Sequence, residues 1–221
     1  MDRPFDMSRD AQALRALLHE VRNRVEEVPC APFDLPQPVR LGAHFIAVRA
    51  QIMSRMKSST QPVKLQMWCD QQGGDPVVYL LKEEDVTSDF FAQELIRMMN
   101  RVWEDDCVMI GSTYVQALTY QVICIGRAAG LVEWVPQSIT LAKLKRICRG
   151  DALCRVLDRM NSQKIRSLAA STVAYLVSNY VIGVGDGHFD NVMLTDAGNI
   201  QNASRHHVQT YKGRGLCRAS L

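Results

Sequence analysis

One stretch of the sequence decides the predicted fold: Gly183-Val184-Gly185-Asp186-Gly187-His188-Phe189-Asp190-Asn191-Val192-Met193-Leu194. Residues 173–182 before the turn carry apolar side chains at helical spacing, which predicts a helix with one buried face. That face consists of Val173, Leu176, Val177, Tyr180 and Val181. The end of the stretch is apolar and precedes a turn signal at 195–198, which predicts a short strand. A polar turn between a buried helix and a buried strand is a common place for catalytic side chains.

The residue types in this turn suit phosphoryl transfer. An Asp can accept the proton of an attacking hydroxyl, and an Asn a few residues later can bind Mg²⁺ through its amide oxygen. Asp186 and Asn191 stand five residues apart, with His188 between them. Taken alone, the turn also fits a Gly- and Asp-rich connection that carries a surface His.

Residues 186–191, with Gly-x-Gly before them and an apolar strand after them, resemble the Asp-Arg-His-x-x-Asn catalytic loop of the phosphoinositide 3-kinase family. The resemblance implies that Asp186 is the catalytic base and that His188 assists the base or the developing phosphate charge. It also implies that Asn191 binds Mg²⁺. Gly187 stands where the family has Arg, so one positive charge beside the site is missing.

Composition limits the class of protein. The 221 residues are 47% hydrophobic and 22% charged, which is typical of a soluble globular protein with one large or two small domains. The net charge of +3 is too small to indicate nucleic-acid binding. Seven Cys residues stand singly without a Cys-x-x-Cys motif, which favours reduced thiols in a cytosolic protein over disulfides or a zinc site. No apolar run reaches the about 18 residues of a membrane span, so any membrane contact is expected to be peripheral.

The N-terminal part is predicted to be a helix followed by a linker. Residues 8–28 have apolar side chains at helical spacing between Ser8 and Pro29, which predicts an amphipathic packing helix. Four Pro residues between positions 29 and 38 then indicate an extended linker and a domain boundary. We assign residues 1–37 to this helix and linker.

Three strands are predicted next: Phe45–Met53, Val63–Cys69 and Val77–Lys82. The loop at 56–62 is similar to the family's phosphate-covering loop. The resemblance implies that Met56, Ser58 and Ser59 contact the phosphates of ATP. Without that resemblance, the loop fits an ordinary hairpin with Ser and Pro.

Lys82 ends the third of these strands. A Lys in this position can direct its ammonium into a cleft and contact phosphates. The resemblance adds that Asp89, near the start of the next helix, matches the family's pocket Asp. In the alternative interpretation, Lys82 only solvates the end of the strand.

A helix capped by Ser88 or Asp89 is predicted to run to about residue 103. Its buried face is expected to be Phe91, Leu95, Met98, Met99 and Val102.

The next two predicted strands, 120–125 and 131–135, resemble the pair that leads into the family's hinge. The resemblance implies that Tyr120 lines an inner pocket. It also implies that the hinge residues Glu133, Trp134 and Val135 hold adenine, with backbone hydrogen bonds from Glu133 and Val135. Each residue alone also fits an ordinary buried hairpin.

The predicted fold is α+β, a bilobal kinase-like fold. Residues 38–136 form an antiparallel β-rich N-lobe with the hinge, and residues 137–200 form an incomplete, mainly helical C-lobe with short helices at 138–149 and 151–161. After Ile200 the family continues with a strand that carries Asp-Phe-Gly. Residues 201–221 lack this motif and form a divergent tail that is expected not to pack.

The resemblance as a whole implies a phosphatidylinositol 3-kinase catalytic domain, truncated before Asp-Phe-Gly. ATP with Mg²⁺ would donate the γ-phosphate, and the inositol ring of a phosphoinositide would accept it. The expected setting is the cytoplasm, peripherally associated with a membrane, with a regulatory subunit as a further partner. Because Asp-Phe-Gly is absent, we expect weak or no activity from this chain. The alternatives are a non-catalytic kinase-like binding module and a fragment of a related large protein kinase.

Overall fold

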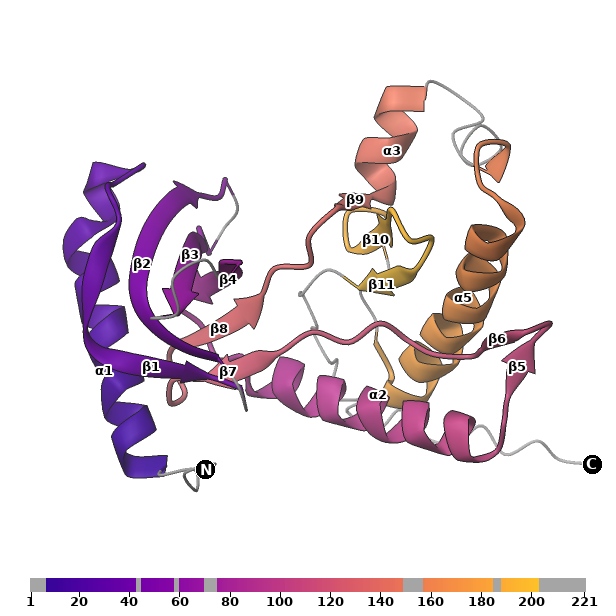
Figure 1. Ribbon diagram of the computed structural model, residues 1–221, viewed down its shortest axis with the longest axis horizontal. Helices are drawn as coiled ribbons and strands as arrows, with labels where there is room; N and C mark the ends of the chain where they lie inside the picture. The colour runs from indigo at the N-terminus through magenta and orange to yellow at the C-terminus, as the bar shows by residue number, and fades with distance from the viewer. Residues whose placement is uncertain are drawn as a thin grey trace, which may run out of the picture. The chain divides into compact units, whose positions relative to one another are not determined.

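The computed structural model describes residues 7–42, 45–57, 60–69, 75–148, 157–184 and 188–202 (Figure 1). The chain divides into two compact units. The first unit contains Met1–Arg97 and Leu118–Ser138, and the second contains Met98–Ala117 and Ile139–Leu221.

The first unit is built on a six-stranded antiparallel sheet in the order β1-β2-β3-β4-β8-β7. Its strands are β1 (Phe33–Leu41), β2 (Phe45–Arg55), β3 (Val63–Cys69), β4 (Val77–Lys82), β7 (Val122–Cys124) and β8 (Gly130–Glu133). The β2–β3 pairing has two register shifts, and β2 is strongly curved (Figure 1). Such shifts bend a strand and increase its twist. The three strands predicted between residues 45 and 82 are confirmed.

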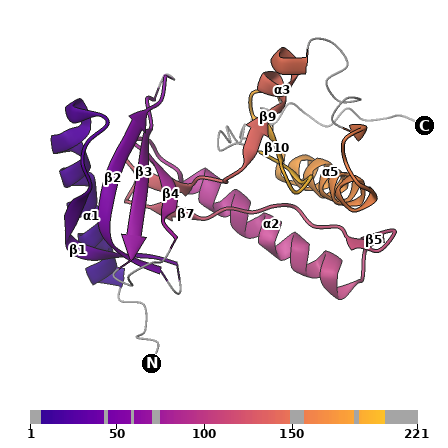
Figure 2. The same ribbon diagram turned by 45° about the horizontal axis from the view of Figure 1, so that its top comes forward.

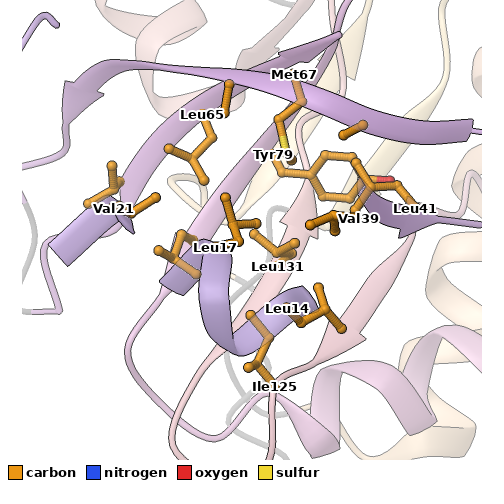
Figure 3. Packing of buried hydrophobic residues seen from close by; sticks show 14 of the residues in the cluster. Leu14, Leu17, Val21, Val39, Leu41, Leu65, Met67, Tyr79, Ile125 and Leu131 are labelled. Atoms are coloured by element: carbon orange, nitrogen blue, oxygen red, sulfur yellow. The ribbon is translucent and has the colours of Figure 1, made fainter. Parts of the chain in front are cut away.

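Helix α1 (Met7–Arg24) is followed by a 3-10 turn, η1 (Val25–Glu27), and packs along the sheet (Figure 2). Leu14, Leu17 and Val21 are 7%, 0% and 1% exposed. They belong to the same buried cluster as side chains of β1, β3 and β8 (Figure 3). The predicted amphipathic packing helix is confirmed, and its apolar face is part of the core of the first unit.

The structure differs from the linker predicted before residue 38. Residues from Phe33 onward form β1, which is the edge strand next to β2. Pro36 and Pro38 lie where the β1–β2 register shifts, between Asp34 and Val39. Proline lacks the N–H group that a central strand needs, but an edge strand with a bulge accommodates it. The Pro-rich segment therefore belongs to the sheet.

Helix α2 (Thr87–Asp105) begins one residue before the predicted cap, and the Asp85 side chain accepts a hydrogen bond from Thr87 N–H at 2.9 Å. The predicted buried face of α2 is wrong. Its buried residues are Asp89, Ala92, Gln93 and Ile96. The expected core residues Phe91, Leu95, Met98 and Val102 are between 46% and 59% exposed, and Met99 is half-buried.

Polar side chains explain this orientation of α2. In the first unit, Gln93 Oε1 accepts a hydrogen bond from Tyr120 N–H at 3.1 Å. In the second unit, Asn100 Nδ2 donates to Ala117 O at 2.8 Å, and Asn100 Oδ1 accepts from Ala117 N–H at 2.9 Å. These bonds satisfy backbone groups that have no sheet partner, so the face that carries Gln93 and Asn100 packs inward.

The second unit contains the hairpin of β5 (Met109–Ile110) and β6 (Thr113–Tyr114), helices α3 (Leu141–Cys148) and α5 (Ser162–Ile182), and strands β10 (Val192–Thr195) and β11 (Ile200–Asn202). A three-stranded sheet has the order β11-β10-β9, with β9 at Ser138–Thr140. The first short helix predicted after the hinge, at 138–149, is confirmed over α3, but residues 138–140 form strand β9 instead. Most of the second one, along with the tail from residue 203, lies outside the described residues.

Helix α5 ends at Ile182 as predicted, but it begins at Ser162, well before the predicted start at residue 173, and its predicted buried face is exposed. Val173, Leu176, Val177, Tyr180 and Val181 are between 40% and 88% exposed. The opposite, small-residue face is buried and lies against β11: Ser171 Oγ accepts a hydrogen bond from Ile200 N–H at 3.0 Å. A Cβ at Gly198 would lie only 2.7 Å from Lys164 O. Small side chains allow this close approach, so they form the packed face.

The predicted α+β architecture, with an antiparallel β-rich part and a mainly helical part, is confirmed. Within the described residues, none of the helices combines the length and the apolar character that crossing a membrane requires.

Gly130 begins β8 opposite Lys82 of β4. A Cβ at this position would lie 2.1 Å from Val86 Cγ2 and 3.0 Å from Ile123 O. Val86 is 1% exposed and cannot move away easily. We expect Gly130→Ala to lower the free energy of unfolding, measured by urea denaturation, by about 1–3 kcal/mol.

A double variant tests the cause of this loss. Val86→Ala alone leaves a small cavity, and the added methyl of Gly130→Ala would fill it. The loss in free energy of unfolding of the combined variant should therefore be smaller than the sum of the two single losses by at least about 1 kcal/mol. Purely additive effects would contradict a steric conflict between these two positions.

Candidate functional site

The candidate site is centred on the ammonium group of Lys82, at the end of β4. Its side chain is 5% exposed, and Nζ lies 3.1 Å from Glu84 Oε1 and 3.5 Å from Asp89 Oδ2. The Asp89 side chain, in the first turn of α2, is 6% exposed, whereas that of Glu84 is 35% exposed. A Lys that only solvates a strand end would not be buried in this way, so that alternative does not fit.

Tyr120 is buried near this ion cluster, with 3% of its surface exposed. Burial raises the pKa of the Tyr120 phenol, and the negative charge of Asp89 raises it further, while a side-chain hydrogen bond with Gln93 lowers it. The phenol is therefore neutral at ordinary pH. The first unit thus brings together Lys82, Asp89 and Tyr120, which the family resemblance assigns to the ATP-binding site.

The backbone of the predicted hinge is partly engaged by the sheet. Glu133 N–H donates to Gln121 O at 2.8 Å, and Trp134 N–H donates to Val78 O at 2.8 Å. Val135 N–H makes no hydrogen bond to another residue that the structure describes. Of these three N–H groups, that of Val135 is the one that can still bind a ligand.

The remaining hinge contacts anchor the segment on both sides. The Trp134 ring lies beneath Lys64, with Nζ 4.1 Å from the ring centroid. Val135 O accepts a hydrogen bond from Ser138 Oγ at 2.8 Å. The Lys64–Trp134 contact and the Ser138–Val135 hydrogen bond both restrict the motion of the hinge backbone.

The loop predicted to cover phosphates lies between β2 and β3. Met56 N–H donates to Pro62 O at 2.9 Å, which closes the loop at its base, and Met56 is 37% exposed. Ser58 and Ser59 lie outside the described residues, so their phosphate contacts stay predictions.

The turn after α5 is described in part. Gly183 ends α5 with a φ of +74°, and its N–H donates to Asn179 O at 2.9 Å. Asp186 lies outside the described residues. Beyond it, Asn191 N–H donates to His188 O at 2.8 Å, and Asn191 Nδ2 lies 3.5 Å from His188 Nε2. The structure therefore brings His188 and Asn191 together, with Asn191 4% exposed and His188 on the surface.

The described residues supply little for a metal ion. In the described part of the chain, no three His, Cys, Asp or Glu side chains lie close enough together to hold one. Asn191, the predicted Mg²⁺ ligand, has one amide oxygen to offer. A single amide oxygen does not make a Mg²⁺ site, which is normally built from carboxylates, phosphates and water.

A polar pocket of about 420 Å³ lies elsewhere in the first unit. Its lining residues are Phe90, Glu94, Arg97, Thr119, Tyr120, Gln121, Val122 and Glu133. Arg97 is paired with Glu94, and its Nη2 donates to Tyr120 O at 2.7 Å. The pocket includes Tyr120 and Glu133 but not Lys82, so it is not centred on the ion cluster.

Sequence reasoning did not predict the contributions of Glu84 and Gln93. Gln93 stands four residues after Asp89, on the same face of the helix, and this spacing was the available signal. Glu84 follows the strand-end Lys82 by two residues, but the sequence does not show that the connection turns its carboxylate back to the ammonium.

No protein-family model matches the sequence. The chain is 27% identical over 173 residues to Phosphatidylinositol 3-kinase 1 of Dictyostelium discoideum. The aligned segment covers 71% of this chain and 11% of that protein. It is 25% identical over 177 residues to Phosphatidylinositol 3-kinase C2 domain-containing subunit gamma of Mus musculus, covering 72% of this chain and 11% of that protein. It is 23% identical over 186 residues to Phosphatidylinositol 3-kinase pik3 of Schizosaccharomyces pombe, covering 79% of this chain and 22% of that protein. The matched segment thus spans between about a tenth and a fifth of the length of these curated relatives.

Proposed function

This chain is a distant relative of the phosphatidylinositol 3-kinases, and we propose that it transfers the γ-phosphate of ATP to the inositol ring of a membrane phosphoinositide. The observation that carries the proposal is the buried cluster in the first unit. There, the Lys82 ammonium at a strand end contacts Asp89, near the buried Tyr120. A buried ammonium held by a carboxylate is a suitable group for binding nucleotide phosphates.

Five of the predicted residues have direct roles in this reaction. Lys82 binds the nucleotide phosphates, and Val135 N–H, with the hinge around it, binds adenine. A ring hydroxyl of the lipid attacks the γ-phosphorus, the bond from that phosphorus to the β-phosphate oxygen breaks, and ADP leaves. Asp186 accepts the hydroxyl proton, and His188 assists. Mg²⁺ bound with the nucleotide would spread the phosphate charge, and Asn191 is the ligand we assign to it.

The proposal also includes the location of the protein in the cell and the rate of phosphoryl transfer. The lipid substrate requires a membrane surface, so the protein would act from the cytoplasm as a peripheral protein, with a regulatory subunit as a further partner. We expect slow transfer, because Gly187 stands where the family has Arg, so one positive charge beside the site is missing.

Lysine labelling tests nucleotide binding in the unaltered chain. An acyl phosphate derivative of ATP acylates a lysine that lies beside the bound phosphates, and mass spectrometry identifies which one. We expect Lys82 to be labelled, and the labelling to fall about tenfold when ATP is added at about ten times its dissociation constant. Lys143, on α3, serves as an internal control that ATP should not protect. Equal protection at both lysines, or none at Lys82, would overturn the proposed site.

A transfer assay separates the proposal from its alternatives. With labelled ATP and phosphatidylinositol vesicles, the proposal expects label in the lipid. Label only in added protein would instead identify a protein kinase. Protection of Lys82 by ATP without any transfer would identify a non-catalytic nucleotide-binding module.

A further inference from the structure

Among the residues that the structure describes, two carboxylates form ion pairs with the ammonium of Lys82. Glu84 is the nearer one, at 3.1 Å, and Asp89 lies at 3.5 Å. If all three groups are ionised, this cluster carries a net charge of −1. Two carboxylates beside the ammonium oppose the approach of a polyphosphate, although the ammonium itself is suited to bind one.

The position of Glu84 follows from its neighbours, which fix the connection between β4 and α2. Glu83 is bonded to Arg22 of α1 through two hydrogen bonds of 3.2 and 2.9 Å. The Asp85 side chain accepts from Thr87 N–H at the start of α2. Val86 is buried against Gly130. Because residues 83, 85 and 86 are all held, the backbone presents Glu84 to Lys82 reproducibly.

The two carboxylates differ in their freedom to leave. The Asp89 side chain is 6% exposed and lies on a helix, so it stays with the ammonium. The Glu84 side chain is 35% exposed and lies on a connection, so a change of rotamer alone would turn it into solvent. A ligand that arrives from solvent therefore meets Glu84 before it meets the buried ammonium.

We propose that Glu84 occupies the phosphate-binding side of Lys82 in the nucleotide-free protein and must turn away before ATP phosphates can contact the ammonium. This inference rests on the proposed nucleotide site. In the exchange, phosphate oxygens replace the carboxylate oxygens of Glu84, while Asp89 keeps Lys82 in place. Glu84 is thus a residue that sets the affinity and the phosphate selectivity of the site, and no covalent step is involved.

Calorimetric titration of the full chain with ATP and with adenosine tests this inference. Glu84→Gln keeps the shape of the side chain and removes its charge. We expect this variant to bind ATP about threefold to tenfold more tightly, because one opposing charge next to the phosphates is gone. The affinity for adenosine, which has no phosphates, should not change. The adenosine-to-ATP affinity ratio is the decisive quantity.

Glu83→Gln is the matched control. It removes the same charge one residue away, from a carboxylate that is bonded to Arg22 and half exposed. The adenosine-to-ATP affinity ratio of the Glu83→Gln variant should equal that of the unaltered chain. Weaker ATP binding in Glu84→Gln would mean that Glu84 positions Lys82 for the nucleotide, which overturns the inference, as would an unchanged ratio. If neither ATP nor adenosine binds the unaltered chain, the proposed function fails, and the inference fails with it.

Discussion

Lys82→Met is expected to lower the free energy of unfolding by about 3–5 kcal/mol, because it leaves a buried carboxylate without its cation. Asp89 is the group at risk, since its side chain is 6% exposed and Lys82 Nζ lies 3.5 Å away. Equilibrium unfolding in urea, followed by circular dichroism, measures the loss.

Two further variants identify burial as the cause. Lys82→Met combined with Asp89→Leu removes the two buried charges and leaves the more exposed Glu84. It should regain most of the loss, because two apolar side chains can pack where a buried ion pair was. Arg22→Met breaks a pair whose side chains are 51% and 50% exposed. It should cost less than about 1 kcal/mol. If Lys82→Met lowers the free energy of unfolding by no more than Arg22→Met does, the charges around Lys82 are solvated rather than buried.

Leu17→Ala is expected to lower the free energy of unfolding by about 2–5 kcal/mol, the range for a leucine truncated in a closed core. Leu17 is 0% exposed, and it belongs to the cluster that contains Val39, Leu65 and Leu131 of the sheet (Figure 3). The cluster joins α1 to the sheet, so the variant should weaken the whole first unit. Urea denaturation followed by Trp fluorescence measures the effect, with Trp68 in β3 and Trp134 after β8 as the probes in this unit.

Leu95→Ala is the matched control for Leu17. The sequence pattern predicts that Leu95 is buried, whereas the structure shows it 46% exposed on α2. Its truncation should change the free energy of unfolding by less than about 1 kcal/mol. If Leu95→Ala costs as much as Leu17→Ala, the orientation of α2 described above is wrong.

Much of the candidate site could be predicted from the sequence, because its signals are local. Lys82 ends an apolar strand, which is a local signal. The assignment of Asp89, at the start of the next helix, depended on the family resemblance, and the short connection between the two elements brings the two side chains together. Tyr120 comes from a distant part of the chain, and its assignment depended on a family resemblance. The roles of Asp186, Ser58 and Ser59 stay predictions, since these residues lie outside the described part of the structure.

By itself, the sequence determined most of the helices and strands, because apolar periodicity and turn residues act on the chain locally. It did not predict β1, since the prolines of this edge strand resemble a linker until the strand pairs with β2. Tertiary structure decided which face of α2 and α5 is buried. Gln93 and Ser171 accept hydrogen bonds from backbone N–H groups of distant segments, so polar and small residues took positions that hydrophobicity alone would give to large apolar ones. The position of Glu84 beside Lys82 likewise depends on tertiary contacts. The residues around Glu84 are held by α1, α2 and β8, and two of these elements, α1 and β8, lie far from Glu84 in the sequence.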